Sequence, residues 1–434
     1  AQRKGASSIG VLAFFLLLTL FLESEDFIIS SPLGRMRPNL LFIITIGFFC
    51  FFLVLSNLKN KTWKVNKAFA LLFLFFIVNI VSLFFADFSD PLRFEMGAKI
   101  LFLYACWLVV FYFIEYICSV PERALTFIKI LFLMGFLETL VGTSEMIAAL
   151  AKGNFYRPDG TISNGDADFY AILLMAFLIS MVVLRILKVT VISKKFDSFF
   201  IFLLALNVFL SFVRSAWGGF IIAMLFLFFL EFINAFGEKK KEDKVAGKII
   251  FSLLLVAIFV LGIYYVFLSA NLQEFALNRL TVPTTDEGDI GGTTGTRLLL
   301  MAESFSYFLQ SPIIGNGPSA FSLQGLLMEE IPWRGDTAFD PSIITTVLND
   351  TGIIGGVVFI WFIVSIFKYV FHMYRKDQNN ILMKYSFAFS ITIFGLLVSY
   401  VPTTALWFPF SWVFFSLPTA LALASRKVTI QELK

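Results

Sequence analysis

Long apolar stretches recur along almost the whole chain, and they constrain the fold more than any other feature. Of the 434 residues, 59% are hydrophobic and only 15% are charged, and 57 are phenylalanine. A soluble domain has about a quarter of its residues charged, whereas a helix needs roughly 20 apolar residues to cross the hydrocarbon core of a bilayer. The composition therefore excludes an ordinary soluble domain and predicts an all-α, polytopic membrane protein.

Twelve stretches are long and apolar enough to be candidate spans. They are residues 8–22, 39–57, 68–85, 99–118, 124–150, 169–187, 198–213, 218–236, 249–270, 352–374, 383–400 and 410–424. The first could pass for a signal peptide, but the spans behind it favour a retained signal anchor. We therefore expect about 12 transmembrane helices in a chain of three parts: transmembrane helices 1–9 (1–269), a large extracytoplasmic helical loop (270–350), and transmembrane helices 10–12 with a cytoplasmic tail (351–434).

The distribution of basic residues predicts the orientation of these spans. If the N-terminus is cytoplasmic and the spans alternate, 23 of the 34 lysines and arginines lie on the inner side and 10 on the outer side. This arrangement satisfies the positive-inside rule. Both termini are then cytoplasmic, and the long loop lies outside the cytoplasm.

Arginine and lysine do not divide between the two sides in the same way. Two lysines fall outside, compared with eight arginines: Arg35, Arg37, Arg93, Arg157, Arg214, Arg279, Arg297 and Arg334. Arginine presents a planar fork of donors that binds phosphate or carboxylate oxygens bidentately and keeps its charge when partly desolvated. An outer-face cavity for a polyanionic ligand is the simplest explanation of this bias.

Arg214 is the sharpest candidate for a functional residue. It follows the apolar run 201–213, and Trp217 and Gly218 open the next span, so almost no turn separates the two spans. An arginine at membrane depth is unfavourable by roughly 2.5 to 3.5 kcal/mol at the midplane, and such residues are functional candidates by default. The alternative is an arginine that snorkels to the interface beside Trp217.

Arg297 begins a helical pattern that runs to Gln310 within the long loop. Thr296 is a suitable N-cap, and a helix N-terminus offers free N–H groups to an anion. An arginine in this first turn would reinforce phosphate binding; the alternative is a surface arginine on a lid-like loop. The preceding glycine-rich run, 288–296, is a flexible loop rather than a Walker motif, because no Gly-Lys-Ser/Thr follows it.

Further polar residues lie in the two outer loops. Aromatic, amide and acidic groups around Arg157, with Asn164 and Asp168, suit a sugar-phosphate ligand, although a turn-rich connection would look much the same. In the long loop, Arg279 and Arg334 add positive charge. The candidate carboxylates there are Asp336 and Asp340, and the latter precedes a proline as a structural N-cap does.

Four short motifs follow one another along the second half of the chain. They are residues 211–218 (SFVRSAWG), 295–297 (GTR), 312–317 (PIIGNG) and 348–355 (LNDTGIIG), and the loop from Arg157 to Asn164 forms a fifth. As an ordered set, they resemble the O-antigen polymerase and O-antigen ligase superfamily of bacterial membrane glycosyltransferases. The resemblance covers about residues 157–356 by motif.

The resemblance implies a metal-independent, inverting glycosyltransferase of the bacterial cytoplasmic membrane. Its substrates would be glycans on undecaprenyl pyrophosphate, with Arg214 and Arg297 gripping the pyrophosphate. The acceptor hydroxyl attacks the anomeric carbon, and guanidinium groups stabilise the leaving group. Such an enzyme works on membrane lipids, with a chain-length regulator as a further candidate partner and with no nucleic acid.

One departure from the family pattern separates the two branches. The ligase branch carries a histidine in the outer loop, whereas the single histidine here, His372, falls on the inner side. The chain therefore looks more like a polymerase than a ligase, and a general base would have to be a carboxylate. Transfer to a lipid A-core acceptor by a ligase remains the alternative.

Two other classes of protein fit parts of the sequence. The acidic run 23–26 could bind a divalent cation in a metal-dependent lipid-linked glycosyltransferase. A transporter or flippase of lipid-linked glycans would also have about twelve spans, although carriers tend to consist of two similar halves. The three cysteines, Cys50, Cys106 and Cys118, lie in apolar runs and indicate neither a disulfide framework nor a thiolate metal site.

Overall fold

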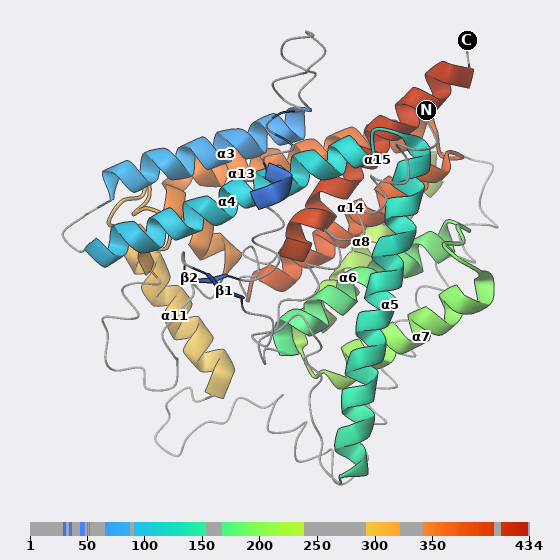
Figure 1. The fold of residues 1–434 in the computed structure, drawn as a ribbon, viewed down its shortest axis with the longest axis horizontal. Helices are drawn as coiled ribbons and strands as arrows, with labels where there is room; N and C mark the ends of the chain where they lie inside the picture. The colour runs from blue at the N-terminus through green and yellow to red at the C-terminus, as the bar shows by residue number, and fades with distance from the viewer. Residues whose placement is uncertain are drawn as a thin grey trace.

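The described part of the chain is almost entirely helical, as predicted. A computed structural model describes residues 29–31, 34–36, 44–47, 50, 52, 66–86, 91–152, 167–237, 292–321, 342–402 and 409–432 (Figure 1). Its one sheet is a short antiparallel hairpin of β1 (Ile29–Ser31) and β2 (Gly34–Met36). This hairpin adds a local detail to an all-α architecture.

Ten long helices make up the described fold. They are α3 (Lys67–Phe85), α4 (Pro91–Ile117), α5 (Pro121–Ala151), α6 (Ala167–Ile186), α7 (Lys194–Leu210), α8 (Arg214–Gly237), α11 (Gly292–Phe308), α13 (Ile343–Lys376), α14 (Ile381–Tyr400) and α15 (Pro409–Glu432). All except α11 coincide with predicted spans, and α11 is the helix predicted in the long loop.

Six of these helices are long and apolar enough to cross a membrane: α3, α4, α5, α6, α13 and α14. The apolar part of α8, Arg214–Leu230, is shorter. The chain is therefore a multi-pass membrane protein. The expected total of about twelve spans is not confirmed, because the candidate spans 8–22 and 249–270 and most of 39–57 lie outside the described residues.

Polar caps and prolines set the helix ends. The side chains of Asn66, Ser342 and Asn380 accept hydrogen bonds from the first-turn N–H groups of α3, α13 and α14, at 3.2, 3.2 and 3.0 Å. Proline occupies the first position of α4, α5 and α15. These residues lie outside the apolar runs, which explains why several helices extend beyond the predicted spans.

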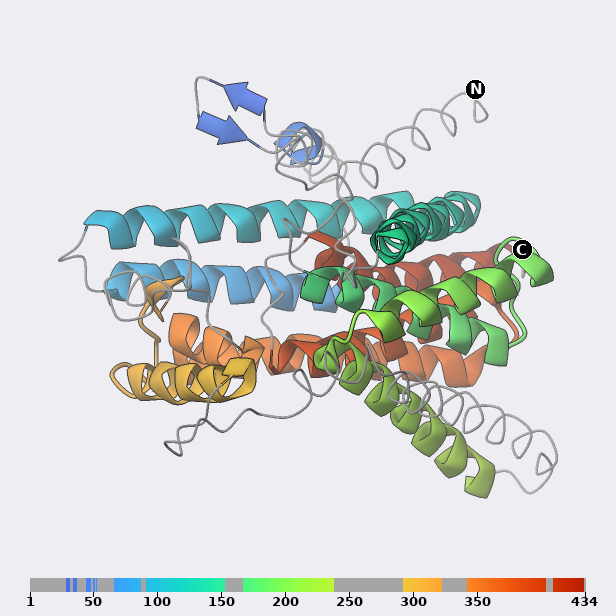
Figure 2. The ribbon, with the colours of Figure 1, turned by 90° about the horizontal axis from the view of Figure 1, so that it is seen from below.

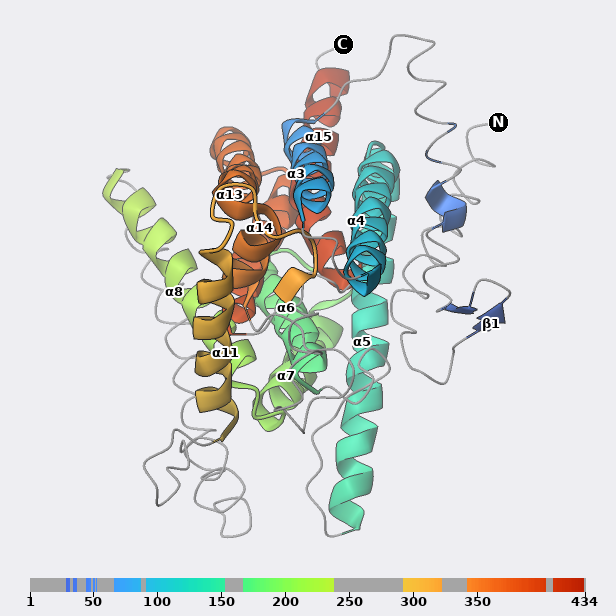
Figure 3. The same ribbon diagram turned by 90° about the vertical axis from the view of Figure 1, so that its left-hand side faces the viewer.

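The helices form layers in which distant parts of the chain lie side by side. Helix α3 packs on both α4 and α13, and Figure 2 shows it between them. Helix α14 packs on α6, α8 and α15, while α15 also covers α4. Figure 3 views the assembly from the end at which α3 finishes and α4 begins, with α11 beside α13.

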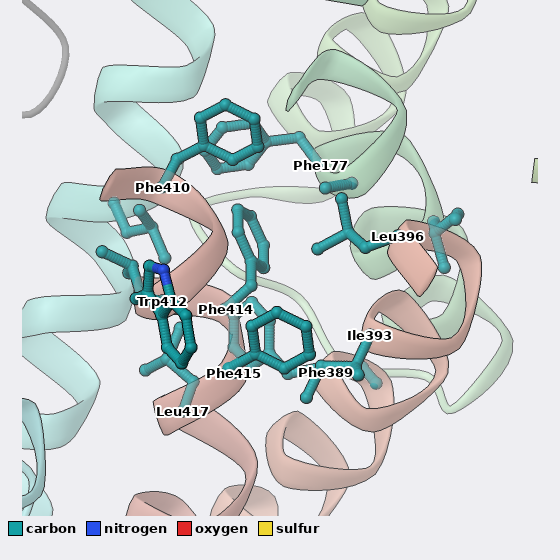
Figure 4. Close-up of a cluster of buried hydrophobic side chains, with 14 of the residues drawn as sticks. Phe177, Phe389, Ile393, Leu396, Phe410, Trp412, Phe414, Phe415 and Leu417 are labelled. Carbon is teal, nitrogen blue, oxygen red and sulfur yellow. The ribbon is translucent and has the colours of Figure 1, made fainter. Parts of the chain in front are cut away.

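Aromatic side chains fill the interior between α4, α6, α14 and α15. The rings of Phe177 and Phe389 pack against Phe414 with centroids 5.4 and 5.8 Å apart (Figure 4). Trp107 stacks on Trp412 with centroids 6.5 Å apart. All five side chains are buried. Because lipid is as apolar as these rings, close packing rather than exclusion from water holds such an interface together.

Candidate active site

The turn that presents Arg214 is short, as the sequence predicts. Helix α7 ends at Leu210 and α8 begins at Arg214 itself. Between them, Phe212 adopts a positive φ of 52°, which is uncommon for a residue with a bulky side chain. The surrounding structure must hold such a conformation in place, and strained residues of this kind cluster at functional sites.

Two side chains fix this turn from below. The Ser211 hydroxyl donates to the carbonyl of Val208 at 2.7 Å and accepts from the N–H of Val213 at 3.3 Å. The indole N–H of Trp217 donates to the same Val208 carbonyl at 2.9 Å. The Trp217 ring is buried and stacks on Phe209 with centroids 5.8 Å apart. Trp217 therefore supports the turn through its packing and its N–H group.

The first turn of α8 is also tied to α14. The Ser399 hydroxyl donates to the carbonyl of Ser215 at 2.9 Å. One turn later Gly219 lies so close to α14 that a Cβ atom there would lie 2.7 Å from the carbonyl oxygen of Gly395. The Arg214 side chain is exposed on this fixed backbone. It can therefore meet a ligand without any rearrangement of the helices.

A network of polar side chains lies inside the membrane part of the fold, one turn of α7 before this site. Tyr170 donates from its hydroxyl to the side-chain oxygen of Asn207 at 3.2 Å, and Asn207 donates from its amide to the Thr143 hydroxyl at 2.8 Å. The Asn207 carbonyl accepts the N–H of Ser211 at 2.9 Å, so the network reaches the turn directly. None of these three residues was predicted from the sequence.

Glu138, within the predicted span 124–150, is a buried acidic residue that was not predicted as a site residue from the sequence. Its side chain is only 4% exposed, and its carbonyl accepts the hydroxyl of Tyr170 at 3.3 Å. An acidic residue within the span α5 is the signal that could have identified it, because buried acids in membrane helices are rare and usually functional. Asp168, which the sequence did single out, lies partly buried in the first turn of α6.

Two of the predicted motifs meet directly in the second part of the candidate site. The segment around Gly315 crosses α13 where that helix is broken at Gly352. Three backbone hydrogen bonds join the crossing: Asn316 N–H to the Asn349 carbonyl at 2.6 Å, Ile353 N–H to Pro312 at 2.9 Å, and Ile354 N–H to Ile313 at 3.3 Å. The motifs at 312–317 and 348–355 thus form one structural unit.

Glycine is required at this crossing for two reasons. Gly315 and Gly352 have φ values of 87° and 65°, and Gly352 departs from helical geometry in the middle of α13. A Cβ atom on Gly315 would lie 2.6 Å from the carbonyl oxygen of Asp350, and one on Gly352 would lie 2.6 Å from the nitrogen of Gly315. The prediction that a span starts at Gly352 is thus corrected. Helix α13 begins at Ile343 and is kinked at Gly352.

Asp350 connects the crossing to α3. Its side-chain Oδ1 accepts the N–H of Ser319 at 3.0 Å, and its carbonyl accepts the hydroxyl of Ser82. Asp350 is buried, with 3% of its surface exposed. The structure thus shows it in the structural role that its position in the motif allows.

Helix α11, which contains Arg297, docks on the same crossing. The Asn349 amide donates to the hydroxyl of Ser304, and the Asn316 amide donates to the carbonyl of Tyr307 at 3.0 Å. The backbone of Arg297 lies in the second turn of α11, which begins at Gly292. The predictions that Thr296 caps this helix, that Arg297 lies in its first turn and that residues 292–296 belong to a flexible loop are therefore wrong. The motif asparagines therefore place the helix that carries the second candidate arginine.

Several predicted site residues lie outside the described residues, and their roles stay predictions. These are Arg157, Asn164, Arg279, Arg334, Asp336 and Asp340, as well as the acidic run 23–26. His372 is exposed near the C-terminal end of α13, far along the helix from the crossing. Within the described ranges, no group of three histidine, cysteine, aspartate or glutamate side chains is arranged to hold a metal ion.

The arrangement is suited to anion binding at the end of a helical membrane domain. A guanidinium at the first residue of α8 adds a full charge to the partial positive charge of the helix N-terminus. The backbone beneath it is fixed by buried hydrogen bonds, so little reorganisation is needed when an anion binds. A second arginine is carried by a helix that is itself docked through buried amides.

Comparison with known families agrees with the motifs. The model of the O-antigen ligase family matches residues 199–360, a stretch that starts in α7 and ends in α13 and includes the Arg214 turn, α11 and the Gly315–Gly352 crossing. No curated protein matches the sequence. The family model does not distinguish a ligase from a polymerase. Over residues 199–360 the chain is therefore similar to the O-antigen ligase family.

Proposed function

We propose that the chain is an O-antigen polymerase-like glycosyltransferase. It transfers a growing glycan from undecaprenyl pyrophosphate to the non-reducing end of another lipid-linked repeat unit, and thereby takes part in lipopolysaccharide biosynthesis. The observation that carries this proposal is the exposed Arg214 on a rigid turn inside the family-matched stretch. A fixed, exposed guanidinium at a helix N-terminus is suited to a pyrophosphate leaving group.

The proposed reaction is a single inverting displacement without a metal ion. The acceptor hydroxyl oxygen forms a bond to the anomeric carbon as the bond from that carbon to the pyrophosphate oxygen breaks. Arg214 and Arg297 neutralise the charge that develops on the pyrophosphate. The hydroxyl proton passes to a carboxylate, for which Asp336 and Asp340 are the proposed candidates.

The remaining predicted residues are assigned to substrate binding. Sugar and phosphate groups are proposed to contact the outer-loop and long-loop residues Arg157, Asn164, Asp168, Arg279 and Arg334. Trp217 is proposed to aid substrate binding indirectly. Its N–H group bonds the backbone carbonyl of Val208 and so supports the turn that carries Arg214. A chain-length regulator is proposed as a partner, because a polymerase needs some means to end elongation.

The proposed location is the bacterial cytoplasmic membrane, with both termini in the cytoplasm. The active site then opens to the periplasm, because Arg214 and the crossing lie at helix ends assigned to the outer side by the distribution of lysine and arginine.

A ligase is the second candidate, since the matching family model is described as an O-antigen ligase. The two reactions share the donor and the leaving group, and they differ in the acceptor. A polymerase extends lipid-linked repeat units, whereas a ligase transfers the glycan to a lipid A-core acceptor.

The decisive experiment supplies purified protein with lipid-linked repeat units, with and without lipid A-core, and with and without a chelator. We expect a ladder of glycan chains that needs no lipid A-core and survives the chelator. Arg214→Ala and Arg297→Ala should each lower the rate by about a hundredfold or more, while the variants elute as folded protein. Transfer only to lipid A-core would favour the ligase, and movement of substrate across vesicles without transfer would favour a transporter.

A further inference from the structure

Helix α11 has three distinct faces. Leu300, Ser304 and Phe308 are buried, and this face contacts α13. A second face is polar and exposed. It consists of Glu303 and Ser306 in the helix and Gln310 just after it. The third face is apolar yet exposed.

The exposed apolar face consists of large side chains at helical spacing. Phe305 is 49% exposed and Leu309 is 58% exposed, one turn apart, and Ile313 follows just beyond the helix with 63% exposure. Side chains four residues apart lie on the same side of a helix, and the N–H of Leu309 still bonds the carbonyl of Phe305 at 3.2 Å, so Phe305 and Leu309 lie on one side; Ile313 is the next exposed apolar residue in the turn that follows. We refer to Phe305, Leu309 and Ile313 as the α11 strip. In water, such a strip beside a polar face would be unfavourable.

The α11 strip continues an apolar surface on α13. The exposed side chains of α13 recur with the helical period and are Ile353, Ile354, Val357, Ile360, Trp361 and Val364. Helix α13 is long and apolar enough to cross the membrane, so this surface faces lipid. The two surfaces meet at the backbone hydrogen bonds that join Ile353 to Pro312 and Ile354 to Ile313.

The direction of α11 fits a helix that lies along a membrane surface rather than through it. In Figure 1, α3, α4 and α15 rise toward the right and α11 descends toward the right, across their direction, whereas α5 stands nearly upright and lies closer to the direction of α11. Helix α11 lies at the end of the assembly where α3 finishes and α4 begins. A helix with one apolar and one polar exposed side, set across the direction of α3, α4 and α15, matches the arrangement of an interfacial helix.

We propose that α11 is an interfacial helix whose strip of Phe305, Leu309 and Ile313 is inserted into the lipid of the same membrane that the spans cross. The proposed partner is the lipid surface itself. Helix α11 therefore contacts α13 on one side, lipid on the second and water on the third. The long loop is attached to the bilayer at this helix rather than held free in solution.

This position has a consequence for the second candidate arginine. A helix that lies in the interface keeps both its ends near the depth of the lipid headgroups. The backbone of Arg297, in the second turn of α11, then lies at the level occupied by the phosphate groups of membrane lipids. A pyrophosphate joined to a lipid chain would lie at the same depth and could contact Arg297. This step rests on the proposed function.

The test measures the depth of individual side chains. Cysteine is introduced at Leu309 or, as a matched control one residue away, at Gln310, and each variant carries a nitroxide label. The protein is placed in vesicles of phosphatidylethanolamine and phosphatidylglycerol, and collision rates are measured with oxygen, which concentrates in lipid, and with a water-soluble nickel complex. Unsubstituted protein gives the background, since Cys50, Cys106 and Cys118 are buried.

The expected result is a ratio of oxygen to nickel collisions that is several-fold higher for L309C than for Q310C, and close to that of V357C on α13. The I313C label, which lies beyond the helix, gives an independent measurement if a change within α11 disturbs folding. Equal and predominantly aqueous collision rates at positions 309, 310 and 313 would overturn the inference. No glycan substrate is needed, so failure of the proposed transfer reaction would leave the depth result unaffected.

Discussion

At the scale of single residues, the candidate site depends on side chains and glycines that permit or hold unusual backbone. Gly352 combines a φ of 65° with a ψ of −166°, a region that is essentially restricted to glycine. Its α-carbon also faces the carbonyl of Ile313 at a distance that leaves no room for a Cβ atom. Gly218, in contrast, has no atom within 4 Å of its would-be Cβ position and lies inside α8.

These two glycines give a matched pair of substitutions. Gly352→Ala should destabilise the fold by about 2 kcal/mol or more, since backbone strain and overlap both act against it. Gly218→Ala should stabilise it slightly, by about 0.5 to 1 kcal/mol, since alanine is the better helix former. Thermal unfolding of the purified proteins in detergent measures both. A Gly352→Ala variant as stable as the parent would contradict the described crossing.

Glu138 offers a test of whether the buried carboxylate in α5, next to the polar network, is needed for function. Glu138→Gln keeps the shape of the side chain but removes its charge, and we expect at least a tenfold loss of glycan elongation with little change in protein yield, since buried membrane acids are usually functional. Glu122→Gln, at an exposed position in the first turn of the same helix, serves as the control. Full activity of Glu138→Gln would show that the charge of this carboxylate is not needed for glycan elongation.

Sequence alone located some of these residues and not others. Arg214 was identifiable because a charged residue between two apolar runs is conspicuous, and the structure confirms the nearly absent turn. The network was not identifiable, because Asn207 and Thr143 are 64 residues apart and only the packing of α5, α6 and α7 brings them together. Nothing in the sequence position of Trp217 indicated that its N–H group bonds the backbone of Val208.

At the scale of elements, helix α11 is the described helix within the long loop, and the broken helix α13 forms the end of that loop. The apolar pattern predicted most spans to within a few residues, because a span must bury its length in lipid. It did not predict the start of α13, since polar residues such as Thr345, Thr346 and Asp350 lower the local hydropathy although the backbone stays helical. Side-chain hydroxyls there bond preceding carbonyls instead, with Thr346 donating to Ser342 at 2.7 Å.

The docking of α11 can be tested by removing one amide. Asn349→Ala deletes the donor to Ser304, so α11 should detach more often, and amide hydrogen exchange across residues 298–308 should become faster by at least tenfold. Asn380→Ala is the control: it removes an N-cap of α14, a loss of about 1 kcal/mol in helix stability, without contact to α11. Unchanged exchange in Asn349→Ala would show that other contacts hold the helix.

At the scale of the whole molecule, the described helices support a multi-pass protein, while its orientation rests on the sequence. The distribution of lysine and arginine could be evaluated from sequence because insertion responds to charge near helix ends. The packing of the helices into layers could not be predicted from sequence, since lipid-facing and buried positions hold the same apolar residue types. The exposed Phe84 and the buried Phe111 illustrate this: both are phenylalanines in predicted spans.

The predicted orientation of the chain in the membrane can be tested at two exposed helix ends, which should lie on opposite sides of the bilayer. Cysteine at Lys152, just after α5, should react with a membrane-impermeant maleimide in intact cells, because this end is predicted to face outward. Cysteine at Gln378, between α13 and α14, should react only after the membrane is permeabilised. Labelling of both variants is scored by gel shift. The reverse pattern would invert the topology and would place the Arg214 turn in the cytoplasm.

The bond from the Ser82 hydroxyl to the Asp350 carbonyl joins residues that are 268 positions apart. A membrane protein is inserted into the bilayer while it is synthesised. Ser82 in α3 can therefore bond Asp350 only after most of the chain has been made. Contacts of such long sequence separation form late, because a large loop has to close first. The crossing at Gly352 is thus among the final events of assembly, and any fragment released before α13 lacks the completed candidate site.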